Sequence, residues 1–311
     1  MSDPPTTGPL AGLPKRATIV EVGPRDGLQN EAALVPTAAK VAFVDALSRA
    51  GLPVIEVTSF VKPQAVAQLA DAEEVLKAIV RRPGIRYAAL VPNERGLERA
   101  LAAGVDEIGV FTAASETFNR RNVNATIAQS LTRFVPVVRR ARAEQLRVRG
   151  YISMSFGCPY EGAIAPAKVI EVADRLGAIG VDEISIGDTI GIATPKAVVD
   201  LCALLLARFD ARRLAMHFHD TRGAALANVM AALQVGIATF DSAAGGLGGC
   251  PYAPGASGNL ATEDLLYMLD GMGIKTGSSI DDVVAATSLL AAALDHEPTS
   301  KYYQAAKRAC A

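Results

Sequence analysis

The sequence lacks a long apolar run, paired cysteines and an excess of charge of either sign. No apolar stretch approaches the ~20 residues that a helix needs to cross a bilayer, and neither a membrane segment nor a targeting peptide is expected. None of the four cysteines belongs to a CxxC pair, a usage typical of a reducing compartment, here the cytoplasm. Lys and Arg number 31 against 32 for Asp and Glu, and this balance predicts neither a nucleic-acid partner nor an anionic membrane surface.

Half of the residues are hydrophobic, which is enough for a sizeable core and too much for a disordered chain. Short β-branched runs alternate with stretches whose apolar residues recur every three or four positions, the spacing of a buried helix face. Thr194 followed by Pro195 is typical of a helix start. The eight runs expected to form strands are 17–23, 53–60, 86–92, 107–113, 147–155, 183–188, 214–219 and 239–244.

A weak internal repeat supports this alternation. Four expected helices end in a glycine, which tolerates the left-handed backbone that closes a helix, and the strand that follows carries an acid. Eight strand–helix units predict one α/β domain, a (β/α)8 barrel. A doubly wound open sheet is the competing interpretation, but no GxGxxG motif follows the first strand. The four pairs are Gly51 and Glu56, Gly104 and Glu107, Gly180 and Glu183, and Gly236 and Asp241.

The barrel is expected to occupy residues 15–278. A Pro-rich segment, residues 1–14, precedes it and is expected to be mobile. Helical patterns continue after the eighth unit, so residues 279–311 are expected to form a small C-terminal helical extension packed on the barrel.

Catalytic groups of such a barrel lie at its mouth, the end where the strands finish, and two of the three histidines fall there. His217 and His219 are two positions apart, so on a strand their side chains face the same way. Structural core histidines are the alternative interpretation, and a metal site is favoured. With Asp26 and an amide oxygen available, the ligands would be nitrogen and oxygen, which suit Mg²⁺ or Mn²⁺ better than structural zinc.

Further polar groups follow other strands. Arg25 and Asp26 alone would be an ion pair on a surface turn; beside the histidines, they are better interpreted as a guanidinium that stabilises an oxyanion and a metal carboxylate. Glu56 and Asp188 are acids on buried strands. Because a buried acid is costly unless paired, each is expected to have an Arg, a Lys or a metal nearby, and Arg25 is the expected partner of one of them.

Cys250 lies in a stretch with six glycines between positions 245 and 258. A lone cysteine is usually a packing residue, but a glycine-rich stretch is suited to closing over a ligand, where a thiol can transfer a proton. A disulfide between Cys158 and Cys250 is a further alternative, since both lie in Cys-Pro-Tyr loops. Cys202 is expected in the core, and His296 is expected as a solvated residue of the last helix.

Three segments together resemble the 3-hydroxy-3-methylglutaryl-CoA lyase family. They are Glu21 to Glu31, with the sequence EVGPRDGLQNE; the tetrapeptide HFHD from His217; and GGLGGCPYAPGASGN, which ends at Asn259. The first two are shared with a broader group of metal-dependent TIM-barrel lyases and Claisen-condensing synthases, whereas the third looks like the lyase signature. The resemblance extends from about residue 13 to residue 273.

This resemblance implies a metal-dependent enzyme, commonly a homodimer, that splits a CoA thioester, 3-hydroxy-3-methylglutaryl-CoA, into acetyl-CoA and acetoacetate in leucine breakdown and ketone-body formation. It implies that Arg25 binds the substrate's carbonyl or enolate oxygen and that Cys250 is the catalytic thiol. Glu56 and Asp188 would be acids that matter for catalysis, and His217 or one of these acids could accept the hydroxyl proton. The implied ligands of Mg²⁺ or Mn²⁺ are Asp26, His217, His219 and Asn259.

Three other interpretations remain open. The chain could be a synthase that condenses acetyl-CoA with a 2-oxo acid, although synthases are not expected to carry the loop around Cys250. It could be a lyase for a homologue of the same thioester with a longer acyl chain. It could also be a non-catalytic barrel that binds a metal or CoA, which the intact set of site residues disfavours.

Overall fold

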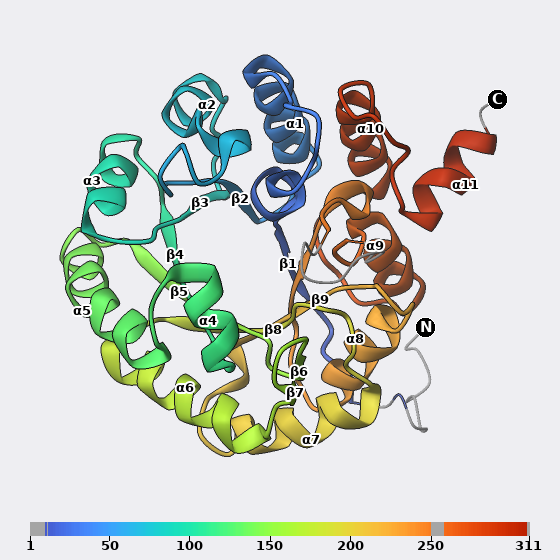
Figure 1. The fold of residues 1–311 in the computed structure, drawn as a ribbon. Coiled ribbons are helices and arrows are strands. Elements are labelled where there is room, and N and C mark those ends of the chain that lie inside the picture. The colour runs from blue at the N-terminus through green and yellow to red at the C-terminus, as the bar shows by residue number, and fades with distance from the viewer. Residues whose placement is uncertain (1–9, 11, 250–257, 310–311) are drawn as a thin grey trace.

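The eight expected strands close into a parallel barrel (Figure 1). In this computed structural model, which describes residue 10, residues 12–249 and residues 258–309, the order around the ring is β1-β10-β9-β8-β5-β4-β3-β2. Each barrel strand lies beside the barrel strands that precede and follow it in the sequence, as in a (β/α)8 barrel. The open-sheet alternative is therefore wrong. The strands are β1 (Thr18–Glu21), β2 (Val54–Ser59), β3 (Arg86–Leu90), β4 (Glu107–Ala113), β5 (Arg147–Ser153), β8 (Glu183–Asp188), β9 (Leu214–Phe218) and β10 (Thr239–Ser242).

Helices surround the barrel (Figure 1), and among the described residues none is both long and apolar enough to cross a membrane. The predicted start at Thr194 is confirmed, because its side chain accepts a hydrogen bond from the N–H of Ala197. The four helix-closing glycines have positive φ values of 79°, 70°, 95° and 92°. The helices are α1 (Thr37–Arg49), α2 (Ala72–Ala78), α3 (Glu94–Ala102), α4 (Glu116–Val123), α5 (Ile127–Ala143), α6 (Pro166–Ile179), α7 (Pro195–Leu206), α8 (Ala225–Gln234), α9 (Thr262–Gly271), α10 (Ile280–Ala291) and α11 (Lys301–Ala309).

A small antiparallel hairpin at the end of β5 was not expected from the sequence. Its two strands are β6 (Gly157–Cys158) and β7 (Gly162–Ala163). Cys158 is buried there with a free thiol, which accepts a hydrogen bond from the hydroxyl of Ser115 at 3.1 Å. Cys202 is buried in α7, as expected.

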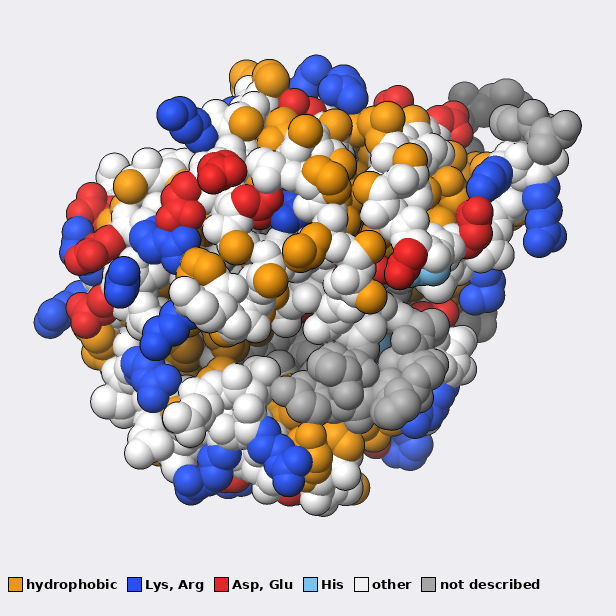
Figure 2. All heavy atoms as spheres, turned by 45° about the horizontal axis from the view of Figure 1, so that its top comes forward, with side chains coloured by type: hydrophobic (Ala, Val, Ile, Leu, Met, Phe, Trp, Pro, Cys, Tyr) orange, Lys and Arg blue, Asp and Glu red, His pale blue; other side chains and the backbone are white. Residues whose placement is uncertain are grey.

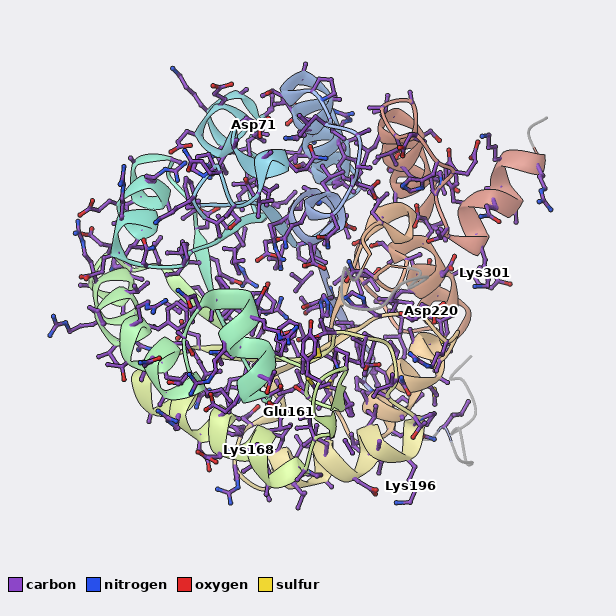
Figure 3. The ribbon with its side chains drawn as sticks, viewed as in Figure 1. Asp71, Glu161, Lys168, Lys196, Asp220 and Lys301 are labelled. Atoms are coloured by element: carbon purple, nitrogen blue, oxygen red, sulfur yellow. The ribbon has the colours of Figure 1, made fainter. Side chains whose placement is uncertain are left out.

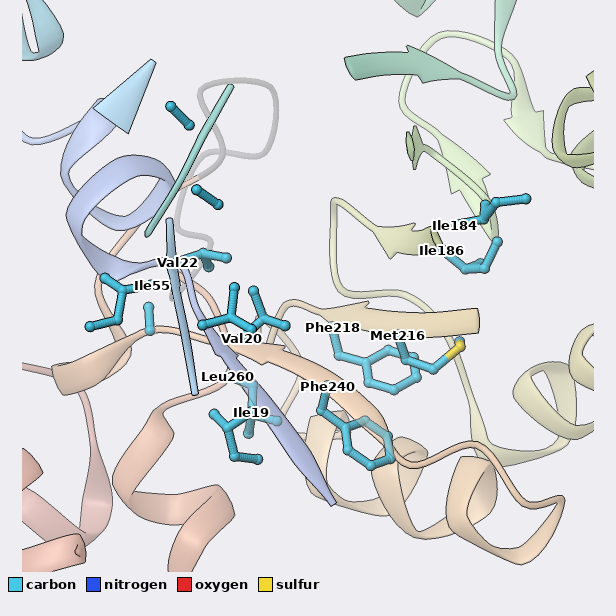
Figure 4. Close-up of a cluster of buried hydrophobic side chains, with 14 of the residues drawn as sticks. Ile19, Val20, Val22, Ile55, Ile184, Ile186, Met216, Phe218, Phe240 and Leu260 are labelled. Carbon is cyan, nitrogen blue, oxygen red and sulfur yellow. The ribbon is translucent and has the colours of Figure 1, made fainter. Parts of the chain in front are cut away.

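The two faces of the barrel strands differ in polarity. Ile184, Ile186, Met216, Phe218 and Phe240 belong to a cluster of buried apolar side chains on β8, β9 and β10 (Figure 4). Successive side chains of a strand point to opposite faces, so the residues that alternate with these face the other way, into the barrel. Four of these alternating residues are polar and buried: Glu183, Ser185, His217 and Asp241.

The C-terminal helices pack against the outer helices. α10 lies against α1 and α9, and α11 lies beside α9 (Figure 1). Lys301, the first residue of α11, is 3.8 Å from Asp220, which follows β9 (Figure 3). His296 is exposed, as expected, with 43% of its side chain accessible, but it lies between α10 and α11 and not in the last helix, and its Nε2 is 2.7 Å from Oε2 of Glu31. This contact attaches the extension to the segment that follows β1.

Candidate active site

A tight turn after β1 carries Arg25 and Asp26. The carbonyl oxygen of Val22 accepts the N–H groups of Arg25, Asp26 and Gly27 at 3.2, 2.7 and 3.1 Å. These bonds wind the chain into a short π-helical turn, η1 (Gly23–Gly27), a form that is frequent at functional sites. The turn places both side chains on the wall of the cavity at the barrel mouth.

Arg25 is held by two carboxylates. Its Nε donates to Oε2 of Glu56 at 2.6 Å, and its Nη1 donates to Oδ1 of Asp26. Oε1 of Glu56 accepts a second hydrogen bond, from the hydroxyl of Tyr151 at 3.0 Å. Burial alone would lower the pKa of Arg25, but Glu56 and Asp26 raise it above its ordinary value. The expectation that Arg25 pairs with one of the two acids is therefore confirmed, and the acid is Glu56.

The two histidines at the end of β9 meet Asp26. One potential ligand atom from each of Asp26, His217 and His219 lies within 4.8 Å of the others. Nδ1 of His217 is 3.2 Å from Oδ2 of Asp241, which leaves Nε2 for a ligand. Burial, followed by the neighbouring His217, lowers the pKa of His219 to about 4. His219 is therefore neutral at pH 7, the form of imidazole that binds metals.

Asn259, the fourth expected ligand, lies beside His219 and Asp26. It pairs with His219 in an isolated antiparallel bridge, and its Nδ2 donates to Oδ2 of Asp26 and to the carbonyl of Leu247, both at 3.0 Å. Within the described part of the chain, its Oδ1 and Nδ1 of His219 are buried without a hydrogen-bond partner. Such atoms are costly unless something binds them. A divalent cation would bind them, so the donor set fits a metal site.

Asp188 is held by the backbone, with a cation nearby. It ends β8 and is 1% exposed, and its carboxylate accepts the backbone N–H groups of Ile192 and Ala193, each at 2.9 Å. Burial raises the pKa of Asp188, while these bonds and the charges of His217 and Arg222 oppose the rise, so the expected arginine is near; Asp188 and Glu56 are both absent from the described residues that line the cavity. Its direct contacts therefore stabilise the segment that leads into α7. Cys250 lies outside the described residues.

The cavity at the mouth has a volume of about 1090 Å³. Arg25, Asp26, His217 and His219 line it, together with the basic residues Lys62, Arg121 and Arg133. On the face visible in Figure 2, basic and acidic side chains are interspersed, in keeping with the balanced charge of the chain. The cavity combines a fixed cation, a metal-type donor set and space for a ligand much larger than a small acid.

Three buried residues behind this site were not proposed for it from the sequence: Arg149, Tyr151 and Asp241. Arg149 is 1% and Asp241 2% exposed, and hydrogen bonds connect both to groups of the site. A signal was present, because polar residues occupy every second position of the strand from Arg147 to Tyr151. In a buried strand this places them together on the inner face.

Comparison with known proteins agrees with this geometry, because the HMGL-like family model matches residues 16–290. The chain belongs to the HMGL-like family. Over 300 residues, this HMGL-like chain is 53% identical to mitochondrial hydroxymethylglutaryl-CoA lyase of Rattus norvegicus, with 96% of the chain and 92% of the rat protein covered. The family resemblance expected from the sequence is confirmed.

Two solved structures extend the comparison of this HMGL-like chain. The crystal structure of hydroxymethylglutaryl-CoA lyase from Pseudomonas aeruginosa matches with a TM-score of 0.93 at 51% identity, covering 96% of this chain and 99% of that one. An HMG-CoA lyase from Acinetobacter baumannii in complex with coenzyme A and 3-methylmalate has a TM-score of 0.90 at 40% identity, covering 94% and 95%. The (β/α)8 fold is confirmed by both.

Proposed function

We propose that this HMGL-like chain is a lyase that cleaves 3-hydroxy-3-methylglutaryl-CoA into acetyl-CoA and acetoacetate. The observation that carries the proposal is the meeting of Asp26, His217 and His219 beside the buried cation of Arg25 on one cavity wall. The relatives support it, since those described above are named as lyases of this thioester. The A. baumannii structure adds that such a protein binds CoA together with a small hydroxy acid.

The proposed cofactor is Mg²⁺ or Mn²⁺. Asp26, His217 and His219 would hold it, with Oδ1 of Asn259 as a further ligand, and the two buried atoms without partners support this set. Nitrogen and oxygen donors of this kind suit either ion. Bound there, a divalent cation supplies Lewis acidity, which lowers the pKa of the substrate hydroxyl.

The reaction needs three movements of charge. The tertiary hydroxyl loses a proton, the bond between C2 and C3 breaks, and its electron pair passes to the thioester as an enolate. Arg25, held in place by Glu56, presents a fixed positive charge on the cavity wall where the enolate oxygen would form. A new carbonyl at C3 completes acetoacetate.

Single residues of the site are proposed to carry the protons of the reaction. We propose His217, Glu56 or Asp188 as the acceptor of the hydroxyl proton; of the three, only His217 is among the described residues that line the cavity. Cys250 is proposed to return a proton to the acetyl-CoA carbanion. Cys250→Ala is expected to lower turnover far more than metal affinity, and normal turnover in this variant would exclude the thiol.

The test is an end-point assay of purified protein with 3-hydroxy-3-methylglutaryl-CoA, read by mass spectrometry. Acetyl-CoA and acetoacetate are expected in equal amounts, only with a divalent metal, and EDTA should stop their formation until Mg²⁺ or Mn²⁺ is restored. Failure to form either product would contradict the proposal. In a parallel reaction, release of free CoA from acetyl-CoA and a 2-oxo acid would instead identify a condensing synthase.

Four further expectations are part of the proposal. The enzyme acts in leucine breakdown, forms a homodimer or a higher homo-oligomer and works in the cytoplasm, and its barrel spans residues 15–278 between a segment of residues 1–14 and an extension of residues 279–311. Light scattering should give twice the chain mass of 32.4 kDa, or a higher multiple of it. Because the rat relative is named as mitochondrial, fractionation of the source cells is needed to establish the location.

A further inference from the structure

A single guanidinium lies behind both halves of the proposed site. Arg149, on β5, is 1% exposed and donates through its Nη2 to Oδ1 of Asp241 at 2.6 Å and through its Nη1 to the hydroxyl of Tyr151 at 3.3 Å. Its Nε is 2.9 Å from Oε1 of Glu183. Two of the three nitrogens thus make hydrogen bonds and Nε makes an ion-pair contact, and the partners lie on β10, β5 and β8.

One of these contacts leads to the metal-type ligands. Asp241 binds Arg149 with one carboxylate oxygen, and the other lies 3.2 Å from Nδ1 of His217 and 3.0 Å from the hydroxyl of Ser185. A carboxylate in this position fixes the ring orientation and the tautomer of a ligating histidine. The carboxylate itself is fixed by Arg149.

The second contact leads to the cation of the site. The hydroxyl of Tyr151 donates to Oε1 of Glu56 at 3.0 Å, and Oε2 of the same carboxylate accepts from Nε of Arg25 at 2.6 Å. The guanidinium carbon of Arg149 also lies 5.0 Å from the centre of the Tyr151 ring, within reach of a cation–π contact. The orientation of Arg25 therefore depends on a chain of contacts that begins at Arg149.

We propose that Arg149 is a positioning residue that aligns His217 through Asp241 and Arg25 through Tyr151 and Glu56. It does not act on the substrate, because it is absent from the described residues that line the cavity, whereas Tyr151, His217 and Arg25 line it. The inference rests on the proposed function for its effect on turnover. Its effect on metal affinity can be measured without substrate.

The role requires the shape of arginine as well as its charge. A guanidinium presents its donors from three nitrogens spread over a rigid plane, while the donors of lysine all leave one nitrogen and cannot reproduce those separate positions. Arg147, two residues earlier on the same strand, offers a matched control. Arg147 lies 3.1 Å from Glu107 and 3.1 Å from Glu183, the acid that Arg149 also contacts. It lines a separate small cavity, away from the site, together with Arg16 and Arg86.

The experiment compares Arg149→Lys with Arg147→Lys. Mn²⁺ affinity is measured without substrate from the electron paramagnetic resonance signal of free Mn²⁺, and kcat is measured at saturating Mn²⁺. Loss of support for a ligating histidine typically costs about 10- to 100-fold in affinity or activity, so Arg149→Lys is expected to lose about tenfold or more in both quantities. Arg147→Lys is expected to retain both. Wild-type values in Arg149→Lys, or equal losses in Arg147→Lys, would overturn the proposal.

Two further variants keep the proposal testable if Arg149→Lys fails to fold. Asp241→Asn interrupts only the branch to His217 and is expected to weaken Mn²⁺ binding. Tyr151→Phe interrupts only the branch to Arg25 and is expected to lower kcat while Mn²⁺ affinity is retained. If neither variant shows its expected loss, Arg149 does not position the site.

The two proposals can fail separately. A chain that binds Mn²⁺ but does not cleave the thioester would contradict the proposed function. Weaker Mn²⁺ binding by Arg149→Lys and Asp241→Asn in that chain, with Arg147→Lys unchanged, would still support the branch from Arg149 to His217. Unchanged Mn²⁺ affinity in both would refute that branch whether or not the wild type is a lyase.

Discussion

The imidazole rings of His217 and His219 lie 5.2 Å apart, centroid to centroid, and are inclined by 50° to one another. Both rings meet Asp26 at one point of the cavity. They differ in support, because Asp241 holds the ring of His217, whereas Nδ1 of His219 has no hydrogen-bond partner in the described part of the chain. One ring is thus held by a carboxylate, and the other carries a buried nitrogen that a metal ligated there would satisfy.

Removing the imidazole of His219 tests the metal site. His219→Ala is expected to abolish metal-dependent activity and the rise in Tm that Mn²⁺ produces in the wild type. A ligand at 100 times its Kd stabilises a protein by about 2.7 kcal/mol, so the wild-type shift should be easy to measure by differential scanning fluorimetry. His296→Ala is the matched variant, because His296 belongs with Glu31 and Asp295 to a second, more exposed group of described residues that could hold an ion; it is expected to keep the Mn²⁺-induced shift. An equal Mn²⁺-induced shift in His219→Ala and the wild type would contradict the site.

Replacing Arg25 by lysine tests the fixed cation. Lysine keeps the charge but cannot bond Glu56 and Asp26 with two nitrogens and still face the cavity. Loss of one preorganised donor to a developing oxyanion typically costs about 10² to 10³ in kcat, and a fall of that size is expected. Arg99→Lys is a suitable control, since Arg99 also pairs with an acid, Glu73, and stacks on a ring, outside the cavity wall. Steady-state kinetics of both variants decide the point.

Two adjacent glycines near Asn259 should respond differently to alanine. Gly248 has φ +106°, and a Cβ there would lie 2.7 Å from Nδ2 of Asn259, whereas a Cβ on Gly249 would meet no atom of the described residues within 4 Å. Gly248→Ala is therefore expected to displace the Asn259 amide and weaken Mn²⁺ binding, in addition to about 1 kcal/mol of backbone strain. Gly249→Ala should retain wild-type affinity. Calorimetric titration with Mn²⁺ compares them, and matching affinities would show that the amide is not a ligand.

Glu21 predicts a pH dependence of stability. Burial raises its pKa to about 7, although its carboxylate accepts hydrogen bonds from Thr262 and from the backbone of Ala244 and Gly23. The pKa in the folded state lies above the unfolded value of 4.5. Glu21 therefore makes its full contribution to the free energy of unfolding below about pH 4.5, and this contribution is lost as the pH rises through about 7. This shift in pKa corresponds to a change of about 3 kcal/mol at most in the free energy of unfolding.

Glu21→Gln removes this titration while keeping an acceptor for the two N–H groups. The Tm of the variant minus the Tm of the wild type is expected to be larger at pH 8.5 than at pH 5.5. Glu94→Gln, an exposed substitution on α3, supplies the baseline. A difference between Glu21→Gln and wild type that is equal at the two pH values would contradict the expected titration.

The sequence by itself determined the barrel and the composition of its mouth. Strand and helix periods are local properties, and in a (β/α)8 barrel every strand ends on the same side, so Arg25, Asp26 and the histidines could be assigned to one end. The shared face of His217 and His219 followed from the period of two along a strand. The same local signals missed the hairpin β6–β7 and wrongly placed His296 in the last helix.

Only the tertiary structure decided which of these groups touch. Glu56 pairs with Arg25, whereas the carboxylate of Asp188 accepts two backbone N–H groups that follow its own strand, β8. Arg149 and Asp241 are 92 positions apart and Tyr151 and Glu56 are 95 apart, yet each pair is hydrogen-bonded across the barrel interior. Such contacts depend on the tilt and stagger of the closed sheet. Closure is a property of all eight strands together, so no local pattern of residues specifies it.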